Sequence, residues 1–139
     1  QAFPEIEKAW RDIIKTITKE RMLYTPLGRR MIFLERLSEE ALDSVIAFIP
    51  QSTIGDKVSS VIYQCHEDPR WPESAQVVLN IHDALITIHK MKDKKAVTNI
   101  MKEHAESPII IRGHPVRIPS EFKHSKADKK GIHRWSTLA

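Results

Sequence analysis

With 139 residues, 41% of them hydrophobic and 29% charged, the chain is long enough for one domain with a core, and its composition excludes collagen-like, low-complexity and disordered proteins. The net charge is +4 and is concentrated at one end: residues 112–139 carry seven basic and two acidic side chains, which makes this segment +5 and the rest of the chain −1. A basic segment suits a polyanion such as nucleic acid, because each phosphate that it neutralises releases counterions. A solvated tail has the same composition, so charge alone leaves both interpretations open.

The sequence carries no pattern typical of membrane or secreted proteins. Its longest apolar runs fall far short of the roughly 20 residues that a membrane span needs. Charged residues such as Glu5, Glu7 and Lys8 interrupt the start of the chain, unlike a signal peptide. Cys65 is the single cysteine, so no intrachain disulfide is expected. We therefore expect a cytoplasmic protein without a membrane partner.

The first half of the chain predicts two helices separated by a hairpin. Apolar residues recur at spacings of three and four over residues 4–22, which indicates an amphipathic helix. Turn residues at 25–28, followed by a short apolar run, predict a hairpin over residues 23–34. Ser38 is a good N-cap for a second helix, in which Pro50 removes one internal hydrogen bond and is expected to bend or break the helix.

The second half predicts a hairpin, a short helix and a last hairpin. Within residues 75–89, two β-branched runs flank His82-Asp83, and a polar pair between apolar runs indicates a functional turn at the tip of a hairpin. A helix is expected over Lys94 to Glu103, and a closing hairpin around Gly113-His114. The residues of this helix expected to face inward are Ala96, Val97, Ile100 and Met101.

Together these elements indicate an α+β fold in which helices pack on one antiparallel sheet. No internal repeat divides the chain, so residues 1–139 are expected to form a single unit. Within it, the lysine-rich residues 123–134 are expected to form a basic loop or insertion.

Four short motifs follow one another along the chain: Thr25-Pro26-Leu27-Gly28-Arg29-Arg30, Pro50-Gln51-Ser52-Thr53, Asn80-Ile81-His82-Asp83 and Ile118-Pro119-Ser120-Glu121-Phe122. In this order, with a long helix around the second motif, they resemble the C-terminal part of family A DNA polymerases, especially those of phage type. The resemblance covers nearly the whole chain. It implies that residues 1–139 are the C-terminal portion of a polymerase palm subdomain with a His-Asp hairpin, acting in DNA replication, in the host cytoplasm if the protein is encoded by a phage.

The resemblance also implies a role for the His-Asp pair. Asp83 would be one of two aspartates that hold the catalytic Mg²⁺ ions, and His82 would lie near the primer terminus. Magnesium takes carboxylate oxygens, and two such ions clamp the attacking and leaving oxygens of phosphoryl transfer. Ala84 stands where the family usually has Glu, so one contributing carboxylate is missing. Without the surrounding motifs, Asp83 would be interpreted as an ordinary turn aspartate.

Contacts with primer-template DNA are a further implication of the resemblance. Gln51 matches a glutamine that faces the minor groove, where an amide reaches acceptor atoms that all base pairs present. Arg29 and Arg30 match the family's Gly-Arg-Arg turn and would contact phosphates. Lys129 and Lys130 belong to the basic segment, and its charge, rather than the resemblance, suggests further phosphate contacts there. An ordinary surface glutamine and locally paired or solvated arginines are the alternative interpretations.

Two parts of a complete polymerase have no counterpart in this sequence. Family A enzymes also need an upstream palm aspartate and a fingers helix that holds the incoming deoxynucleoside triphosphate. The expected partner is therefore an N-terminal polymerase fragment, without which the chain is expected to be inactive. The alternative is a non-catalytic nucleic-acid-binding or structural module descended from the same family. An unrelated enzyme with a His82/Asp83 dyad is disfavoured, because adjacent strand residues point to opposite faces.

Overall fold

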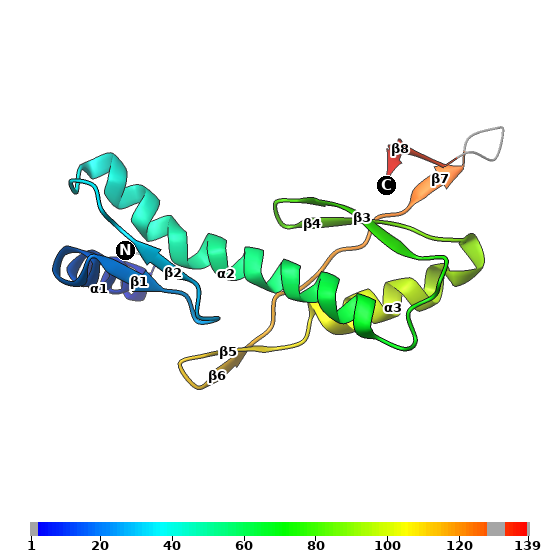
Figure 1. Cartoon of the computed structure of the whole chain (residues 1–139), viewed down its shortest axis with the longest axis horizontal. Coiled ribbons are helices and arrows are strands. Elements are labelled where there is room, and N and C mark those ends of the chain that lie inside the picture. The colour runs from blue at the N-terminus through cyan, green and yellow to red at the C-terminus, as the bar shows by residue number, and fades with distance from the viewer. Residues whose placement is uncertain (1–2, 128–132, 139) are drawn as a thin grey trace.

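The computed structural model describes residues 3–127 and 133–138, which form an elongated α+β structure arranged along one long helix (Figure 1). The helices are α1 (Pro4–Glu20), α2 (Glu39–Glu67), the short 3₁₀ helix η1 (Met91–Asp93) and α3 (Lys94–Ala105). The strands are β1 (Met22–Tyr24), β2 (Arg30–Ile32), β3 (Gln76–Ile81), β4 (Ala84–Ile88), β5 (Ile109–Ile111), β6 (His114–Val116), β7 (Ser125–Ala127) and β8 (His133–Leu138). Among the helices described, none combines the length and apolar character needed to cross a membrane.

The helix predicted over residues 4–22 is confirmed as α1. It ends at Glu20 because Arg21 adopts the left-handed conformation, with φ of 57°, and donates its backbone N–H to the carbonyl of Ile17. The apolar face is covered only near this end. Ile17 is fully buried, whereas Phe3 and Trp10 at the other end are 67% and 48% exposed.

The hairpin expected over residues 23–34 is confirmed as β1 and β2, joined by a turn. The side-chain oxygen of Thr25 accepts a hydrogen bond from the backbone N–H of Arg29 at 3.0 Å, and Gly28 takes a φ of 88° that favours glycine. Leu23 from this hairpin packs with Ile17, Phe33 and Val45, which form the first of two small cores.

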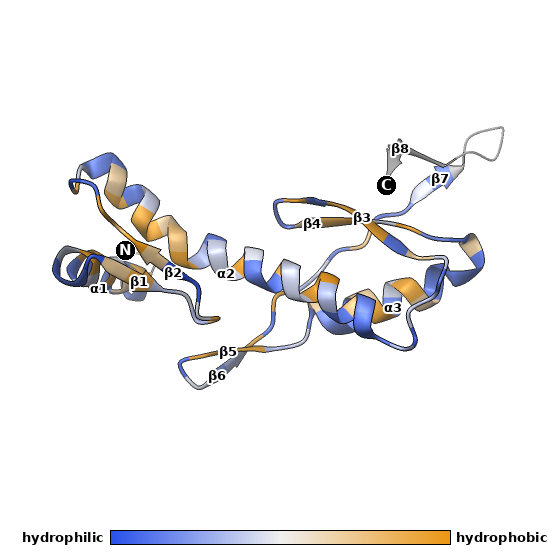
Figure 2. Ribbon diagram, in the orientation of Figure 1, coloured by the Kyte–Doolittle hydropathy of each residue, from blue (hydrophilic) through white to orange (hydrophobic). Residues whose placement is uncertain are grey.

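The long helix α2 connects the two cores. Ser38 caps it as predicted, its hydroxyl accepting from the backbone N–H of Ala41 at 3.2 Å. The helix then continues without interruption through Pro50, so the proline does not break it, and Figure 1 shows a gentle change of direction along its length. Figure 2 shows the hydrophobic residues of α2 gathered near α1 and near α3, with a more hydrophilic stretch between.

The second core joins the far half of α2 to α3 and the base of the β3–β4 hairpin. Its buried members are Val61, Cys65, Ala75, Val97, Ile100 and Met101. Ala96, expected to face inward, is exposed instead. Successive residues of an α-helix are about 100° apart, so Ala96 falls at the edge of the face centred on Val97.

The expectation of one antiparallel sheet is wrong. The described strands form four separate two-stranded antiparallel ribbons, β1–β2, β3–β4, β5–β6 and β7–β8. Each of these strands forms hydrogen bonds only with the other strand of its own hairpin, so the hairpins do not join into a larger sheet. The turn of β5–β6 lies at Arg112-Gly113, one residue before the expected position, where both residues have positive φ.

The hairpin β5–β6 is not the last one, because β7 pairs with β8 further along the chain. Within residues 123–134, expected to form a basic loop or insertion, Ser125–Ala127 form a strand and β8 begins at His133. Residues 128–132, between the two strands, lie outside the described part of the chain.

Candidate functional site

His82 and Asp83 form the two-residue turn of the β3–β4 hairpin, between the paired residues Ile81 and Ala84. Both side chains are exposed. His82 has a φ of 54°, a left-handed conformation that costs a residue with a side chain about 1–2 kcal/mol. Strain of this kind gathers at functional sites and motivates a functional hypothesis for the turn.

The hairpin is anchored along β4 rather than through the two residues of its turn. Thr87 of β4 donates its hydroxyl to the sulfur of Met101 in α3 at 3.3 Å, and Leu85 packs against the second core. The tip projects beyond these contacts (Figure 1). The protein therefore holds His82 and Asp83 on a ribbon that is anchored along β4 and whose turn is open to a partner.

The carboxylate of Asp83 has the right chemistry for Mg²⁺ but lacks companions. Magnesium needs several oxygen ligands. Among the described residues, no group of three or more His, Cys, Asp or Glu side chains is placed to hold a metal ion. The residues present therefore fit a magnesium ion in donor type but not in number, and Asp83 could hold one only together with carboxylates from elsewhere.

Gln51 lies on α2 directly after Pro50, with its side chain exposed. The neighbouring Thr53 is buried and donates its hydroxyl to the carbonyl of Ile49 at 2.6 Å. This stretch of α2 thus presents Gln51 outward while Thr53 faces the interior.

The two adjacent arginines have different surroundings. The guanidinium of Arg29 forms an ion pair with Asp56 of α2, with a 2.8 Å hydrogen bond from Nε to Oδ1. The second carboxylate oxygen of Asp56 is buried and has no hydrogen-bond partner among the described residues. Arg30 is exposed on β2 opposite Tyr24, and it forms no ion pair with any described residue. Arg29 therefore ties the turn to α2, and Arg30 is the arginine open to an external phosphate.

The predicted site residues do not converge in this chain alone. No hydrogen bond or ion pair between described residues joins His82 or Asp83 to Gln51, Arg29 or Arg30. Lys129 and Lys130 lie outside the described residues. The β1–β2 hairpin lies beside α1, and the β3–β4 hairpin starts from the end of the molecule that carries α3 (Figure 1).

Lys57 is a buried charge whose role the sequence interpretation missed. Its side chain is 7% exposed, and its ammonium donates to the carbonyls of His104 and Ser107 at 2.9 and 2.8 Å and to the Ser107 hydroxyl at 2.6 Å. Burial lowers the pKa of Lys57. The signal in the sequence is its position four residues after Thr53 and four before Val61, within an otherwise buried stripe of α2.

A second polar cluster joins the ends of α2 and α3. Asp68 accepts hydrogen bonds from the guanidinium of Arg70 and from Nε2 of His104, the latter at 2.9 Å. The hydrogen bonds from Arg70, followed by that from His104, hold the pKa of Asp68 well below its usual range. Arg70 also pairs with Glu103 at 3.1 Å. Each charged group of this cluster is paired with another, so we interpret the cluster as a link that holds the ends of α2 and α3 together.

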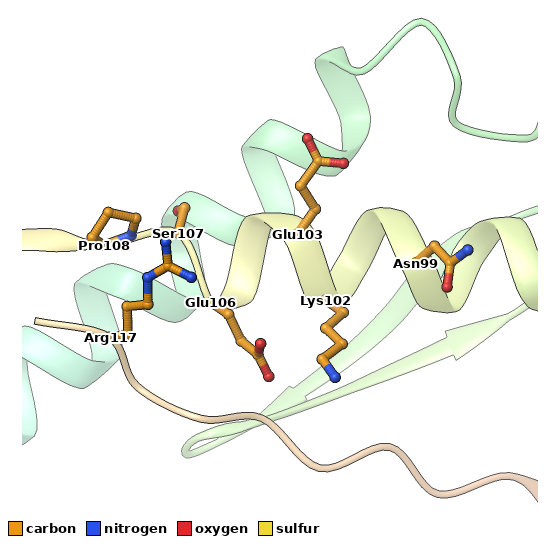
Figure 3. A pocket seen from close by; sticks show the side chains of 7 residues that line it. All are labelled: Asn99, Lys102, Glu103, Glu106, Ser107, Pro108 and Arg117. Atoms are coloured by element: carbon orange, nitrogen blue, oxygen red, sulfur yellow. The ribbon is translucent and has the colours of Figure 1, made fainter.

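Two depressions lie side by side along the exposed surface of α3 and share Asn99. One, of about 410 Å³, lies where α3 faces the returning chain that carries Arg117. Figure 3 shows Lys102 and Glu106 pointing to one side of α3 and Glu103 to the other. The second depression, of about 450 Å³, is lined by Lys92, Lys94, Lys95 and His124 among others. In the sequence, this second depression is indicated by the concentration of basic residues between His89 and Lys95.

Comparisons with known proteins found no matching family model, no similar curated protein and no similar solved structure.

Proposed function

We propose that this chain is the C-terminal palm part of a DNA-directed DNA polymerase, active only together with an N-terminal part. The observation that carries the proposal is the exposed His82-Asp83 turn at the tip of an anchored hairpin. Its support from the sequence is the order of the four motifs that resemble family A polymerases. In this role Asp83 contributes one carboxylate to a magnesium site that other carboxylates complete.

The β3–β4 ribbon has features expected of a piece of a larger sheet. Among the described strands, β3 and β4 pair only with each other, so one edge of each is unpaired, and such edges recruit further strands. It also exposes apolar side chains, among them Leu79 at 50% and Ile88 at 62%. A strand and a covering layer from an N-terminal polymerase fragment would bury these groups, and the same fragment would supply the second aspartate and the triphosphate site.

Within this proposal, primer-template DNA is contacted by the residues that remain exposed. Gln51 would reach minor-groove acceptors, and His82 would lie near the primer terminus. Arg30 is better placed for a phosphate than Arg29, because Arg29 is already paired with Asp56. Lys129 and Lys130 would add nonspecific phosphate contacts.

Primer extension by the reconstituted enzyme tests this proposal. The chain is combined with a polypeptide that carries the missing palm aspartate and fingers helix, and incorporation of deoxynucleotides is measured with Mg²⁺. Asp83→Asn is expected to remove nearly all incorporation while DNA affinity stays close to unchanged, because the carboxylate acts on the reacting groups rather than on the duplex. Asp43→Asn, an exposed aspartate on α2, is the matched control and should retain activity.

The chain by itself is expected to incorporate no nucleotide. Measurable extension by the purified chain alone, or near-normal extension by the Asp83→Asn enzyme, would contradict the proposed role of Asp83.

A non-catalytic nucleic-acid-binding or structural module is the second candidate. The observation that favours it is the solitary carboxylate of Asp83, with Ala84 beside it where the family usually has Glu. It predicts DNA binding by the chain alone and no dependence of any polymerase on Asp83. Full extension by Asp83→Asn together with retained DNA binding would support it.

A further inference from the structure

The depression at the start of α3 brings together basic side chains from one segment and a histidine from another that is distant in sequence. Lys92, Lys94 and Lys95 come from η1 and the first turn of α3, and His124 comes from the chain just before β7. The depression has a volume of about 450 Å³ and shares Asn99 with the neighbouring one, whose charged lining residues are Lys102, Arg117, Glu103 and Glu106. Together the two form a groove along α3.

The positive charges at this end of the groove are not neutralised within the described chain. No carboxylate lines the depression, and none of its three lysines forms an ion pair with a described acidic residue. Asp93, which lies between them in sequence, accepts a hydrogen bond from the hydroxyl of Ser74 at 2.7 Å. In the neighbouring depression, the carboxylate of Glu106 is held by the backbone N–H and hydroxyl of Ser120.

The electrostatics of His124 agree with this arrangement. Burial, and then the positive charges of Lys94 and His89, lower the pKa of His124. Lys94 and His89 therefore lie near His124, and the lowered pKa favours its neutral imidazole, which contributes a hydrogen-bonding group rather than a charge. The positive charge that an anion would meet here comes from the lysines.

The lining indicates which class of anion fits. Recognition of a peptide by strand addition or by a helix-binding groove needs a sheet edge or apolar pockets, and the lysine-lined depression offers only Met91 as an apolar lining residue. A nucleic-acid backbone needs none of these, because basic side chains and small polar donors such as Thr98 and Asn99 suffice for phosphate contacts. Three lysines line this depression, so it offers ammonium groups for more than one phosphate.

We propose that this groove binds the phosphodiester backbone of a nucleic-acid strand through Lys92, Lys94, Lys95 and His124. The inference goes beyond the proposed polymerase role and uses none of the residues assigned there. It makes the start of α3 a second nucleic-acid contact on the molecule, apart from the hairpin tip.

Fluorescence anisotropy with a labelled single-stranded DNA of about 20 nucleotides tests the proposal, since sites of this kind cover several nucleotides. The full chain is compared with Lys92→Gln/Lys95→Gln. The matched control is Lys15→Gln/Lys19→Gln on α1, which removes the same charge from exposed lysines at the other end of the molecule. The groove variant is expected to bind about tenfold more weakly, and its salt slope should become shallower by about 0.7 for each phosphate that the protein no longer neutralises.

The control variant is expected to stay within about twofold of the unmodified chain, because its lysines contact no phosphate. Equal losses of affinity in both variants would overturn the proposal, since binding would then depend on net charge alone. Unchanged affinity of the groove variant would overturn it as well. Single-stranded RNA is a parallel arm: a matching loss of affinity there supports recognition of the backbone in general, and a loss with DNA alone supports DNA as the natural source.

Competition by polyglutamate of the same total charge tests whether the groove binds an acidic peptide instead. If polyglutamate displaces the labelled DNA as strongly as unlabelled DNA does, the groove is a peptide site and the proposal fails. A second experiment needs no variant, so it does not depend on whether a variant folds. Lysine acetylation is measured on the unmodified chain with and without DNA, and DNA should protect Lys92, Lys94 and Lys95 but leave Lys15 and Lys19 reactive. Uniform reactivity would overturn the proposal. Because no step requires nucleotide incorporation, failure here is separable from failure of the polymerase proposal.

Discussion

The ammonium of Lys57, in the middle of α2, lies 2.8 Å from the carbonyl oxygen and 2.6 Å from the hydroxyl oxygen of Ser107, just beyond the end of α3. It also contacts the carbonyl of His104 at 2.9 Å. The last carbonyls of a helix lack partners within the helix, and a cation there both pairs with them and complements the helix dipole. One side chain of α2 therefore fixes the end of α3.

Replacing Lys57 should destabilise the fold. Lys57→Ala leaves the carbonyls of His104 and Ser107 without their partner, and we expect a loss of about 2–3 kcal/mol in the free energy of unfolding. Lys57→Met keeps the aliphatic packing and should also destabilise, though less. Urea denaturation followed by circular dichroism measures both. Lys15→Ala, at an exposed position on α1, is the control, and an unchanged midpoint for both Lys57 variants would contradict the assignment.

Stability should fall in acid because of Asp68. The pKa of this carboxyl is lowered in the folded state, so its stabilising contribution is present above the ordinary aspartate pKa of about 4 and is lost as the pH falls below it. Asp68→Asn should therefore be less stable than the unmodified chain at pH 7, and the difference should shrink toward pH 2.5. Urea midpoints across this range provide the measurement. A constant difference at all pH values would show that the effect is not ionic.

The single cysteine should be unreactive in the folded protein. Cys65 is 1% exposed, and burial, with a smaller effect of Asp68, raises the pKa of its thiol to about 11. The thiolate is the reactive form, so iodoacetamide at pH 8 should modify Cys65 slowly without denaturant and rapidly in urea. Mass spectrometry follows the modification. Rapid labelling of the native chain would mean that the second core opens readily.

The strained turn residue provides a test of what the hairpin tip is for. Because His82 has a positive φ, His82→Gly should relieve strain and raise the free energy of unfolding by about 0.5–1 kcal/mol. Asp83→Gly, at a position without positive φ, should lower it. A stabilised His82→Gly chain that loses primer extension in the reconstituted enzyme would indicate that the histidine is retained for function. Destabilisation by His82→Gly would instead indicate a structural contact of the ring.

The two neighbouring arginines should separate stability from DNA binding. Arg29→Ala removes the partner of Asp56 and is expected to lower the melting temperature. Arg30→Ala should leave the melting temperature unchanged and weaken DNA binding with a shallower salt dependence. Thermal denaturation and anisotropy titrations distinguish the two effects. If Arg29→Ala weakened DNA binding without loss of stability, its pairing with Asp56 would not be its main role.

Several local features could be predicted from the sequence by itself, because each depends on residues close together in the chain. The apolar spacing of residues 4–22 predicted α1, and the hydroxyl of Ser38 predicted the start of α2. The polar pair His82-Asp83 between β-branched runs predicted the tip of the β3–β4 hairpin. Helical periodicity, capping and turn chemistry depend on a few neighbouring residues, so they can be recognised in the sequence without a tertiary structure.

Only the tertiary structure decided which of these elements meet. The strands remained four separate ribbons rather than one sheet, since pairing between distant strands depends on many weak contacts that no short motif encodes. Arg29 and Lys57 look like ordinary surface cations in the sequence, and only the approach of α2 engages the first with Asp56 and buries the second beneath the end of α3. The basic groove likewise exists because the chain returns past α3 and brings His124 beside Lys94, a proximity across 30 positions that local propensity cannot determine.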